Sequence, residues 1–394
     1  MQSIFSSPNP ILFGRGTSGQ TGEKLREFGC TKVLVVFDKG IKASGIADRI
    51  VDIINASGIE TVCFDGVLPD PPDWSVEEAG ALGVREGVDG VVGLGGGSSL
   101  DTAKAAKLLL TNPPPINQYF GREGVKTVES KPLIVIPTTA GTGSEATPGG
   151  VITDTKNNIK TNIAGTGCKV NLGIVDPELT LGLPQTVTAS TGMDALCHAV
   201  ESYTSQRANS FCELTGRQAI KLVGEYLETA CKDGKNLDAR EGMMLAATLG
   251  GISMSGPLCH LAHDIGKVLG AKFHIPHGVG CASCLPQVLE VIAPAVPEKV
   301  KYVAECFGAV IPDDAGAGEI GKSAYEVIRR LMREIELPNL KSFGATKEEL
   351  LAVVPEGVKM QQDGLIKLFG QGTSPVPVTI ELISEIISRA YDEN

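Results

Sequence analysis

Four short apolar runs, separated by stretches with helical spacing, dominate the first 180 residues of the chain. Runs of this kind that alternate with helical patterns indicate βαβ units, in which the strands are parallel. Their continuous hydrophobicity is typical of a sheet covered by helices on both faces. The runs are KVLVVFD (32–38), IETVCFD (59–65), VDGVVGLGG (88–96) and PLIVIPTT (132–139). We also expect VITDTKNNIKTNI (151–163) to form a hairpin that turns near Asn157 and Asn158.

The pattern changes near residue 185, beyond which strand-like runs are rare. Three later segments have the apolar spacing of helices. They are DAREGMMLAATLGG (238–251), VPEKVKYVAECFGA (296–309) and EIGKSAYEVIRRLMREIEL (319–337). The sequence therefore predicts an α/β domain over residues 1–185 and an all-α domain over residues 186–394. A ligand site is expected in the cleft between the two halves.

Composition argues against several classes of function. The net charge is −11 and no basic run is present, which disfavours nucleic acid and anionic lipid as partners. No apolar run approaches the about 20 residues that a membrane-spanning helix needs. The opening MQSIFSSPNPILFGRG lacks the pattern of a secretion signal, so a soluble, cytoplasmic protein is expected.

The ten cysteines are then expected to be free and mostly buried thiols. The closest pair, Cys281 and Cys284, has no second pair with which to complete a zinc ribbon. Because cysteine is among the most buried residue types, we interpret this pair as structural.

Two glycine-rich turns follow predicted strands in the first half. Glycine lets the backbone approach a ligand, and a helix start attracts phosphate, although tight turns also use glycine for steric reasons alone. In the first glycine-rich turn, we expect Ser98 to be the N-cap of a helix. Asp101 would then lie in the first helical turn. The second turn, PTTAGTGSEAT (137–147), offers hydroxyl groups to a diphosphate or a ribose. The residues expected to bind a cofactor in these turns are Gly95, Gly96, Gly97, Ser98, Asp101, Thr138, Thr139, Thr142 and Ser144.

Asp38 ends the first of the apolar runs. A carboxylate at this place can accept hydrogen bonds from ribose hydroxyls and repel a 2′-phosphate. The alternative interpretation of Asp38 is a turn or helix-capping residue. Taken together, Asp38 and the two glycine-rich turns indicate a dinucleotide cofactor, and they favour NAD(H) over NADP.

All five histidines lie in two short segments of the second half. His198 follows Asp194 by four residues, which puts both side chains on one face of a helix. The other four, His260, His263, His274 and His277, lie within eighteen residues. A single histidine is more often structural than a ligand, but this clustering favours a divalent transition metal with positions left open for substrate. Such donors suit iron(II), zinc, cobalt or nickel.

Five motifs occur in an order that resembles the iron-containing alcohol dehydrogenases, a group related to glycerol dehydrogenase and dehydroquinate synthase. They are GGGSSLDTAK, PTTAGTGSEAT, IVDPELT, TGMDALCHAVESY and HIPHG, and the resemblance covers roughly residues 8 to 310. It implies a dinucleotide-binding α/β domain, a helical domain, iron(II) rather than zinc in the cleft, and a dimer or larger homo-oligomer. It also implies Lys160 near the nicotinamide ribose and supports Asp38 at the adenosine ribose. The implied metal ligands are Asp194, His198, His263 and His277.

The chain departs from the family pattern at several positions. Lys267 stands where members usually carry a second histidine that helps to relay the proton. His260 occupies a position where small residues are common. Gly149 and Gly150 stand where many members place larger side chains that line the substrate pocket, and Asp70 replaces an asparagine.

We therefore predict a metal-dependent NAD(H) oxidoreductase that interconverts a primary alcohol and an aldehyde. The metal acts as a Lewis acid on the substrate oxygen, and hydride passes to or from the nicotinamide. Candidates for the proton relay are Lys267, His274, His260 and a ribose hydroxyl. The alternatives are a lyase of the dehydroquinate synthase type and a non-catalytic metal or nucleotide sensor.

Lys267 has three interpretations: a solvated helix residue, a proton relay with a lowered pKa, or a fixed positive charge that receives an anionic group. Combined with a roomier pocket at Gly149 and Gly150, the last interpretation predicts a substrate larger than ethanol, such as an aldehyde that carries a carboxylate.

Overall fold

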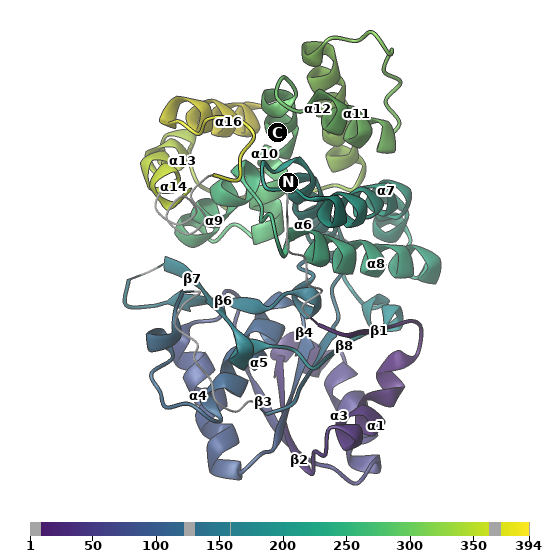
Figure 1. The fold of residues 1–394 in the computed structure, drawn as a ribbon, viewed down its shortest axis with the longest axis vertical. Coiled ribbons are helices and arrows are strands. Elements are labelled where there is room, and N and C mark those ends of the chain that lie inside the picture. The colour runs from purple at the N-terminus through teal and green to yellow at the C-terminus, as the bar shows by residue number, and fades with distance from the viewer. Residues whose placement is uncertain (1–8, 122–130, 158, 362–371, 394) are drawn as a thin grey trace. The chain divides into compact units, whose positions relative to one another are not determined.

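The computed structural model describes residues 9–121, 131–157, 159–361 and 372–393. Its contacts divide the chain into two units (Figure 1). One runs to Gly182 but leaves out Ala140–Thr142, and the other combines Ala140–Thr142 with the chain from Leu183 onward. The ranges 1–185 and 186–394 stay a prediction of domains.

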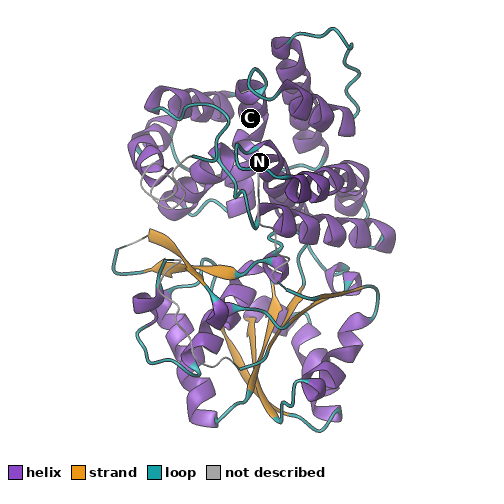
Figure 2. Cartoon of the chain, in the orientation of Figure 1, coloured by secondary structure: helices purple, strands orange, loops and turns teal. Residues whose placement is uncertain are grey.

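Within the described residues, a six-stranded parallel sheet forms the centre of the first unit, in the order β1-β8-β5-β4-β2-β3. Helices α1 and α3 lie on one face, and α4 and α5 on the other (Figure 2). The strands are β1 (Ile11–Phe13), β2 (Lys32–Asp38), β3 (Glu60–Val67), β4 (Gly90–Gly95), β5 (Leu133–Pro137) and β8 (Leu172–Val175). The helices are α1 (Thr21–Glu27), α2 (Lys39–Ala43), α3 (Ile46–Ala56), α4 (Asp73–Glu86) and α5 (Gly97–Leu109).

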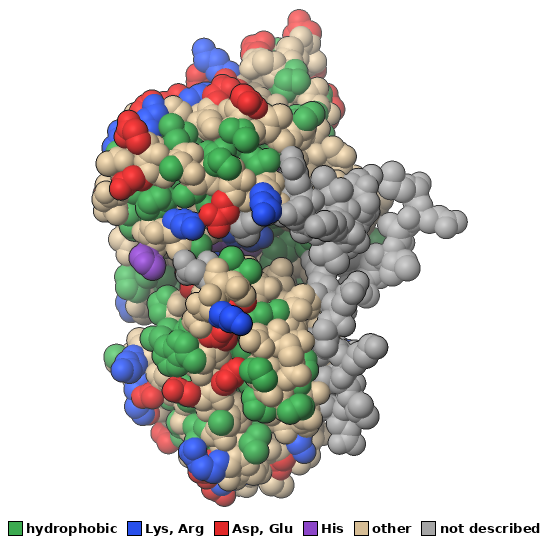
Figure 3. Space-filling model, turned by 90° about the vertical axis from the view of Figure 1, so that its left-hand side faces the viewer, with side chains coloured by type: hydrophobic (Ala, Val, Ile, Leu, Met, Phe, Trp, Pro, Cys, Tyr) green, Lys and Arg blue, Asp and Glu red, His purple; other side chains and the backbone are tan. Residues whose placement is uncertain are grey.

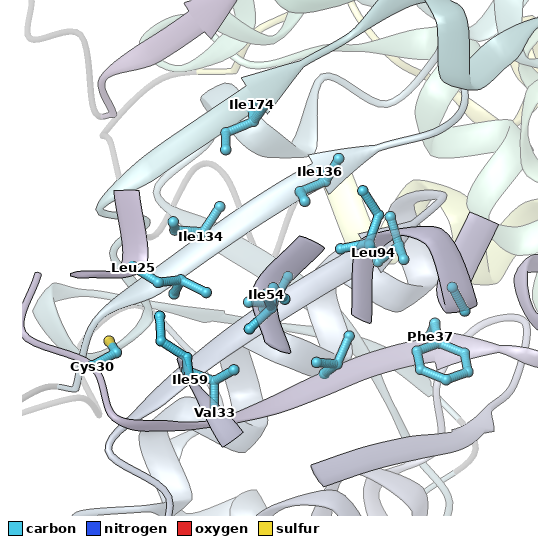
Figure 4. Packing of buried hydrophobic residues seen from close by; sticks show 14 of the residues in the cluster. Leu25, Cys30, Val33, Phe37, Ile54, Ile59, Leu94, Ile134, Ile136 and Ile174 are labelled. Carbon is cyan, nitrogen blue, oxygen red and sulfur yellow. The ribbon is translucent and has the colours of Figure 1, made fainter. Parts of the chain in front are cut away.

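The apolar run of β2 shows why this sheet is covered on both faces. Val33, Val35 and Phe37 pack with the residues of α1 and α3 (Figure 4), whereas Leu34 and Val36 pack with those of α4 and α5. Since successive side chains of a strand point to opposite faces, an uninterrupted apolar run requires apolar cover on both. The predicted strands are confirmed to within two residues at each end.

The strand order creates a switch point at the carboxyl ends of β2 and β4. The chain leaves β2 for β3 on one side and then returns to form β4 on the other side. Ligands bind at such points in open parallel sheets. Asp38 at the end of β2 and Gly95 at the end of β4 lie together there, since a Cβ atom built on Gly95 would be 3.3 Å from Asp38 Oδ2.

The predicted hairpin is also present. Strands β6 (Gly149–Asp154) and β7 (Ile159–Ala164) pair antiparallel. The Asp154 carboxylate accepts hydrogen bonds from the backbone N–H groups of Lys156 and Asn157, which supports the turn at its start. Asn158 lies outside the described residues.

In the second unit, α6 lies at the centre and contacts α7, α8, α9 and α10. Every residue of α6 from Gly192 to Thr204 is buried, as expected for a helix that is surrounded by others. The three segments predicted to be helical correspond to α8, α11 and α12. The helices are α6 (Gln185–Thr204), α7 (Ser210–Lys232), α8 (Leu237–Met254), α9 (Leu261–Phe273), α10 (His277–Ile292), α11 (Pro297–Cys306), α12 (Ala317–Glu334), α13 (Lys347–Ala352), α14 (Val354–Gln361) and α16 (Ile380–Asp392).

Three observations bear on the expectations drawn from composition. The ten cysteines are free thiols, mostly buried, as predicted. On the face drawn in Figure 3, basic and acidic side chains of the described residues are interspersed. Among the described helices, none combines the length and the apolar character needed to cross a membrane.

Candidate active site

Four side chains from three helices converge in the second unit. Asp194 and His198 belong to α6, His263 belongs to α9, and His277 is the first residue of α10. Asp194 Oδ1 lies 3.8 Å from His263 Nε2 and 3.7 Å from His277 Nε2. Asp194 Oδ2 lies 3.9 Å from His198 Nδ1. The carboxylate therefore lies among three imidazoles that come from segments up to 83 residues apart in the sequence (277 − 194).

Several of these donor atoms are buried without a hydrogen-bond partner. They are Asp194 Oδ1, His198 Nδ1 and His263 Nε2. A buried polar atom left unpaired costs about 1–3 kcal/mol, so three at one point call for an explanation. A bound divalent cation would supply the missing partner to each, and the donor set therefore fits the metal that the sequence predicts.

The protonation state of His263 also suits a ligand. Burial first, and then the neighbouring charges of His198 and Lys267, lower the pKa of His263 well below its usual value. The imidazole is therefore neutral and retains a lone pair on one ring nitrogen, as a metal ligand must.

A glycine brings α10 against α6 at this place. A Cβ atom at Gly278 would lie 2.1 Å from the carbonyl oxygen of Ser190 and 3.2 Å from Asp194 Cβ. Any larger residue would push the start of α10 away from α6, and His277 with it.

Glu201, which the sequence analysis did not select, supports His263. It lies on α6 and is fully buried. Its Oε2 bonds His263 Nδ1, and its Oε1 accepts hydrogen bonds from the backbone N–H groups of Ala262 (2.8 Å) and His260 (3.2 Å) at the start of α9. When the carboxylate accepts the proton on Nδ1, the lone pair is left on Nε2, the atom that faces Asp194. One carboxylate thus caps α9 and sets the tautomer of His263.

His260 bonds to residues other than the converging ligands. It is fully buried, and its Nε2 lies 2.9 Å from Thr204 Oγ1. Because the Thr204 hydroxyl donates its hydrogen to the carbonyl oxygen of Val200, His260 Nε2 is the donor to Thr204. Burial lowers the pKa of His260, and the charge of Glu201 partly opposes this. His260 links α6 to the start of α9 as a neutral imidazole.

Lys267 lies on α9, and His274 directly follows this helix. Lys267 is half-buried one turn beyond His263, and its charge acts on both His263 and Cys259. Within the described residues, its ammonium has no hydrogen bond or ion pair. His274 is exposed and ends α9 in the left-handed conformation, with φ of 54°. This conformation is typical of the residue after a helix.

In the first unit, the turn after β4 differs in detail from the expectation. Helix α5 begins at Gly97, its N-cap is Gly96, and no side chain caps it. Ser98 is therefore inside the helix and not its cap, and Asp101 lies in the second turn. The reason is that Gly95, with φ of 140°, bends the chain early enough for the helix to start before Ser98. The uncapped N–H groups of this helix start are suited to a phosphate.

The second glycine-rich turn is tied to the first. Thr138 N–H donates to the carbonyl oxygen of Gly95 (3.0 Å), and Thr139 lies beside Gly96. Asp101 accepts hydrogen bonds from Ser144 Oγ (2.7 Å) and from the N–H of Val151 (2.8 Å). Asp101 and Ser144 thus hold the two turns together. Thr142, in contrast, belongs to the second unit.

Asp38 has the helix-capping role that was one of its two interpretations. Its Oδ1 accepts the N–H groups of Gly40 (2.8 Å) and Ile41 (3.0 Å) at the start of α2. Its Oδ2 accepts a hydrogen bond from Ser99 Oγ (3.2 Å). A contact with a ribose stays a prediction.

Three further positions can be compared with the expectations from sequence. Lys160 on β7 forms an ion pair with Asp70 at 2.6 Å, and its place near the nicotinamide ribose stays a prediction. A Cβ atom would lie 2.3 Å from the carbonyl oxygen of Ile163 at Gly149, and 2.9 Å from Asp101 Cβ at Gly150. The backbone and Asp101 already fill this space, so these glycines serve close packing. The expectation that they enlarge a pocket is therefore wrong.

Comparison with known proteins identifies the family. The model of the iron-containing alcohol dehydrogenases matches residues 8–177, and that of the C-terminal part of the Fe-containing alcohol dehydrogenase family matches residues 188–391. The chain belongs to the iron-containing alcohol dehydrogenase family. The predicted family and fold class are thereby confirmed, and with them the prediction of an oxidoreductase of the alcohol dehydrogenase class.

Three similar proteins illustrate the range of this family. A choline dehydrogenase of Bacillus subtilis is 36% identical over 91% of this chain and 89% of its own length. A sulfoacetaldehyde reductase of Bilophila wadsworthia is 35% identical over 89% of this chain and 91% of its own. The crystal structure of a sulfoacetaldehyde reductase of Bifidobacterium kashiwanohense in complex with NAD⁺ is 28% identical, with a TM-score of 0.87 over the full length of both chains.

A buried lysine in the α/β unit of this family member was also missed from the sequence. Lys104 on α5 is fully buried, and its ammonium donates to the carbonyl oxygen of Ser144 (2.8 Å), to Ser144 Oγ (2.7 Å) and to the carbonyl oxygen of Gly149 (2.6 Å). The signal that could have revealed it is its helical position three residues after Asp101, which holds the same turn.

Replacing Lys104 with methionine should loosen the second glycine-rich turn. Each acceptor left unpaired costs about 1–3 kcal/mol, so the thermal midpoint is expected to fall and NADH to bind more weakly. Differential scanning fluorimetry and NADH fluorescence titration measure the two effects. Lys42→Met is the matched control, because Lys42 forms an exposed ion pair with Asp48. Equal NADH affinity in wild type and Lys104→Met would show that Lys104 does not hold the second glycine-rich turn in the shape that NADH binding needs.

Proposed function

We propose that this chain is an NAD(H)-dependent alcohol dehydrogenase or aldehyde reductase that holds a divalent cation with Asp194, His198, His263 and His277. The observation that carries the proposal is the convergence of buried donor atoms without hydrogen-bond partners on Asp194. A cation bound there would act as a Lewis acid on the substrate oxygen. Iron(II) is the metal of the family, and zinc is the alternative because nitrogen and oxygen donors bind it at least as tightly.

The chain's own residues prepare this centre before a cation binds. Glu201 fixes the Nδ1–H tautomer of His263, and burial keeps that imidazole neutral. Burial on α6 also keeps Asp194 from being screened by water. The donors would therefore be preorganised, which lowers the conformational cost of binding.

For the cofactor, we propose that NAD(H) binds at the carboxyl ends of β2 and β4. The uncapped start of α5 would receive the diphosphate through Gly96, Gly97 and Ser98. Asp38 would accept a ribose hydroxyl through Oδ2, and Thr138 Oγ1, which is buried without a partner, is a further donor. The NAD⁺ complex of the sulfoacetaldehyde reductase supports this choice of cofactor.

For the substrate, we propose an aldehyde that carries an anionic group, received by Lys267. A half-buried ammonium without an ion pair in the described part of the chain favours a negative partner. Lys267 and His263 are four residues apart on α9, so both lie on one face of the helix. One relative is named for the anionic sulfoacetaldehyde, and another for the cationic choline. The filled space at Gly149 and Gly150 gives no support to a larger substrate.

For the proton relay, His274 and a ribose hydroxyl are the proposed groups. We propose that His260 instead has a structural role, because it is fully buried and bonded to Thr204. A homo-oligomer in the cytoplasm is the expected context.

Replacing Lys267 with alanine tests the substrate proposal. The assay is NADH oxidation by anaerobically purified, iron-loaded protein with pairs of carboxylated and neutral aldehydes of equal length. Because a hydrogen bond to a charged group contributes about 1.5–3 kcal/mol, kcat/KM for the acids should fall about 10- to 100-fold, and that for the neutral aldehydes should change little.

Lys272→Ala is the matched control on the same helix, where Lys272 pairs with Glu356 at 3.2 Å. An unchanged ratio of acid to neutral turnover in Lys267→Ala would refute Lys267 as the anion receptor. Absence of turnover with every aldehyde, while NADH still binds to the wild type, would instead favour a lyase or a sensor.

A further inference from the structure

The middle of the second glycine-rich turn contacts the helix that carries Asp194. Residues Ala140–Thr142 of this turn belong by their contacts to the second unit, whereas the residues on either side of them belong to the first. A Cβ atom at Gly141 would lie 2.7 Å from Thr191 Cβ, 2.9 Å from the carbonyl oxygen of Thr191 and 3.1 Å from its Cα. Since Thr191 is on α6, the turn and this helix are in backbone contact at Gly141.

Lack of space, and not backbone conformation, excludes a side chain at position 141. The φ of Gly141 is not in the left-handed region, so alanine can adopt the same backbone conformation. Carbon atoms in contact are about 3.5–4.0 Å apart, so a methyl group at this position would require a movement of about 1 Å. The atoms that it would meet belong to the backbone of Thr191 or are bonded to it, so the turn or the helix itself must move.

The same turn of α6 supports the proposed metal ligands. Thr191 and Ser190 precede Asp194 by three and four residues, which is one helical turn. The carbonyl oxygen of Ser190 is also the atom that Gly278 approaches where α10 begins. One turn of α6 is therefore in close contact with both Gly141 and Gly278, and a shift of this turn would carry Asp194 with it.

Gly141 is connected equally closely to the proposed dinucleotide site. Thr139, two residues before it, lies beside Gly96, and the N–H group of Thr138 donates to the carbonyl oxygen of Gly95 at 3.0 Å. These contacts join the second glycine-rich turn to the start of the helix proposed to receive the diphosphate. A displacement at Gly141 would therefore reach the cofactor through the chain and Asp194 through α6.

We propose that Gly141 is a positioning residue for hydride transfer, which keeps the cofactor turn at its working distance from the helix that carries Asp194. In reduction, a C–H bond at C4 of the nicotinamide breaks and a C–H bond forms at the aldehyde carbon, while the aldehyde oxygen takes a proton from the relay. NADH is oxidised and the aldehyde is reduced. Gly141 touches none of the reacting atoms. The inference deepens the proposed function and depends on it.

Replacing Gly141 with alanine tests this role by separating catalysis from binding. The assay is NADH oxidation with butanal and with its carboxylated counterpart of equal length. A misplacement of about 1 Å can cost about 100-fold in rate, so kcat should fall by about this factor with both aldehydes. NADH affinity and metal content should stay at wild-type values, because each binding site keeps its own contacts.

Gly318→Ala is the matched control. Gly318 lies on α12, and a Cβ atom there would meet nothing within 4 Å. This variant should therefore keep the wild-type kcat, NADH affinity and metal content.

Proton relaxation tests the positioning without turnover. The metal-free, full-length protein is loaded with paramagnetic cobalt(II) and saturated with NAD⁺, and the zinc-loaded protein is the diamagnetic reference. The relaxation enhancement of the nicotinamide C4 proton falls with the inverse sixth power of its distance from the cobalt. At equal occupancy, we expect a smaller enhancement in Gly141→Ala than in the wild type, and an unchanged one in Gly318→Ala.

A second substitution on α6 distinguishes the lost contact from a folding defect. The double variant Gly141→Ala/Thr191→Gly lacks Thr191 Cβ, the atom nearest to the new methyl group. Since residues in contact are energetically coupled, the double variant should recover about tenfold in kcat relative to Gly141→Ala. Thr191→Gly alone completes the comparison.

Three results would overturn the positioning role while the proposed function stands. They are a wild-type kcat in Gly141→Ala, a loss of NADH affinity in proportion to the loss of kcat, and a double variant that folds but recovers no turnover. Absence of bound cobalt and of NADH-dependent turnover in the wild type would instead overturn the proposed function, and the role of Gly141 with it.

Discussion

Alanine in place of Asp194 is expected to abolish NADH-dependent turnover while NADH still binds. The Asp194 carboxylate lies within 4 Å of ring nitrogens of His198, His263 and His277, so its loss removes the negative charge at the centre of the proposed ligand set. Lewis-acid catalysis contributes several kcal/mol, and each 1.36 kcal/mol is tenfold in rate, so kcat should fall by about 10³-fold or more. Steady-state NADH oxidation and metal content measure the result.

Asp313→Ala is the matched control, because Asp313 is an exposed aspartate of the same unit that pairs with Lys301 at 3.1 Å. It should leave both metal content and turnover at wild-type values. NADH affinity should be the same in all three proteins, since the proposed dinucleotide site belongs to the other unit. Wild-type metal content in Asp194→Ala would contradict the ligand assignment.

Glutamine in place of Glu201 is expected to weaken metal binding about 10- to 100-fold, the usual effect of losing a carboxylate that orients a ligating histidine. The amide can present its NH₂ group to His263 Nδ1, which would force the proton onto Nε2, the nitrogen that faces Asp194. Turned the other way, the NH₂ group would meet the backbone N–H groups of His260 and Ala262. The first orientation opposes metal binding directly, and the second opposes it by destabilising the start of the helix that carries His263.

Competition with a chelator of known affinity gives the metal dissociation constant, and thermal unfolding of the metal-free protein separates a general loss of stability from a loss of affinity. Glu213→Gln is the control, because Glu213 pairs with Lys299 at the surface of the same unit and such pairs contribute little. If Glu201→Gln lowered the thermal midpoint but bound metal as tightly as Glu213→Gln, Glu201 would have only a capping role.

The core of the sheet could be predicted because the central strands β2, β4 and β5 carry apolar runs whose side chains are buried. The run at Lys32–Asp38 predicts a strand from its own residues alone, because its apolar side chains are buried on both faces of the sheet. Strands β1 and β8 were missed because three and four residues are too short to show a period. Only their parallel pairing with each other, and that of β8 with β5, reveals them.

The candidate site was predictable where residue types are rare. Clustering of the histidines and the spacing of Asp194 and His198 pointed to residues that the fold does bring together. Glu201 was missed because glutamate is common and its role depends on tertiary contacts. A signal existed, since Glu201 lies seven residues after Asp194 on a buried helix.

One buried helix carries Asp194, His198 and Glu201 with intervals of four and three residues. Each added or deleted residue turns an α-helix by about 100°. An insertion between Asp194 and Glu201 would therefore aim the carboxylates and the imidazole in different directions at once, whereas a point substitution alters one group. We infer that descendants of this sequence can diversify the loops and the substrate contacts freely, but that the length of this segment is fixed by geometry.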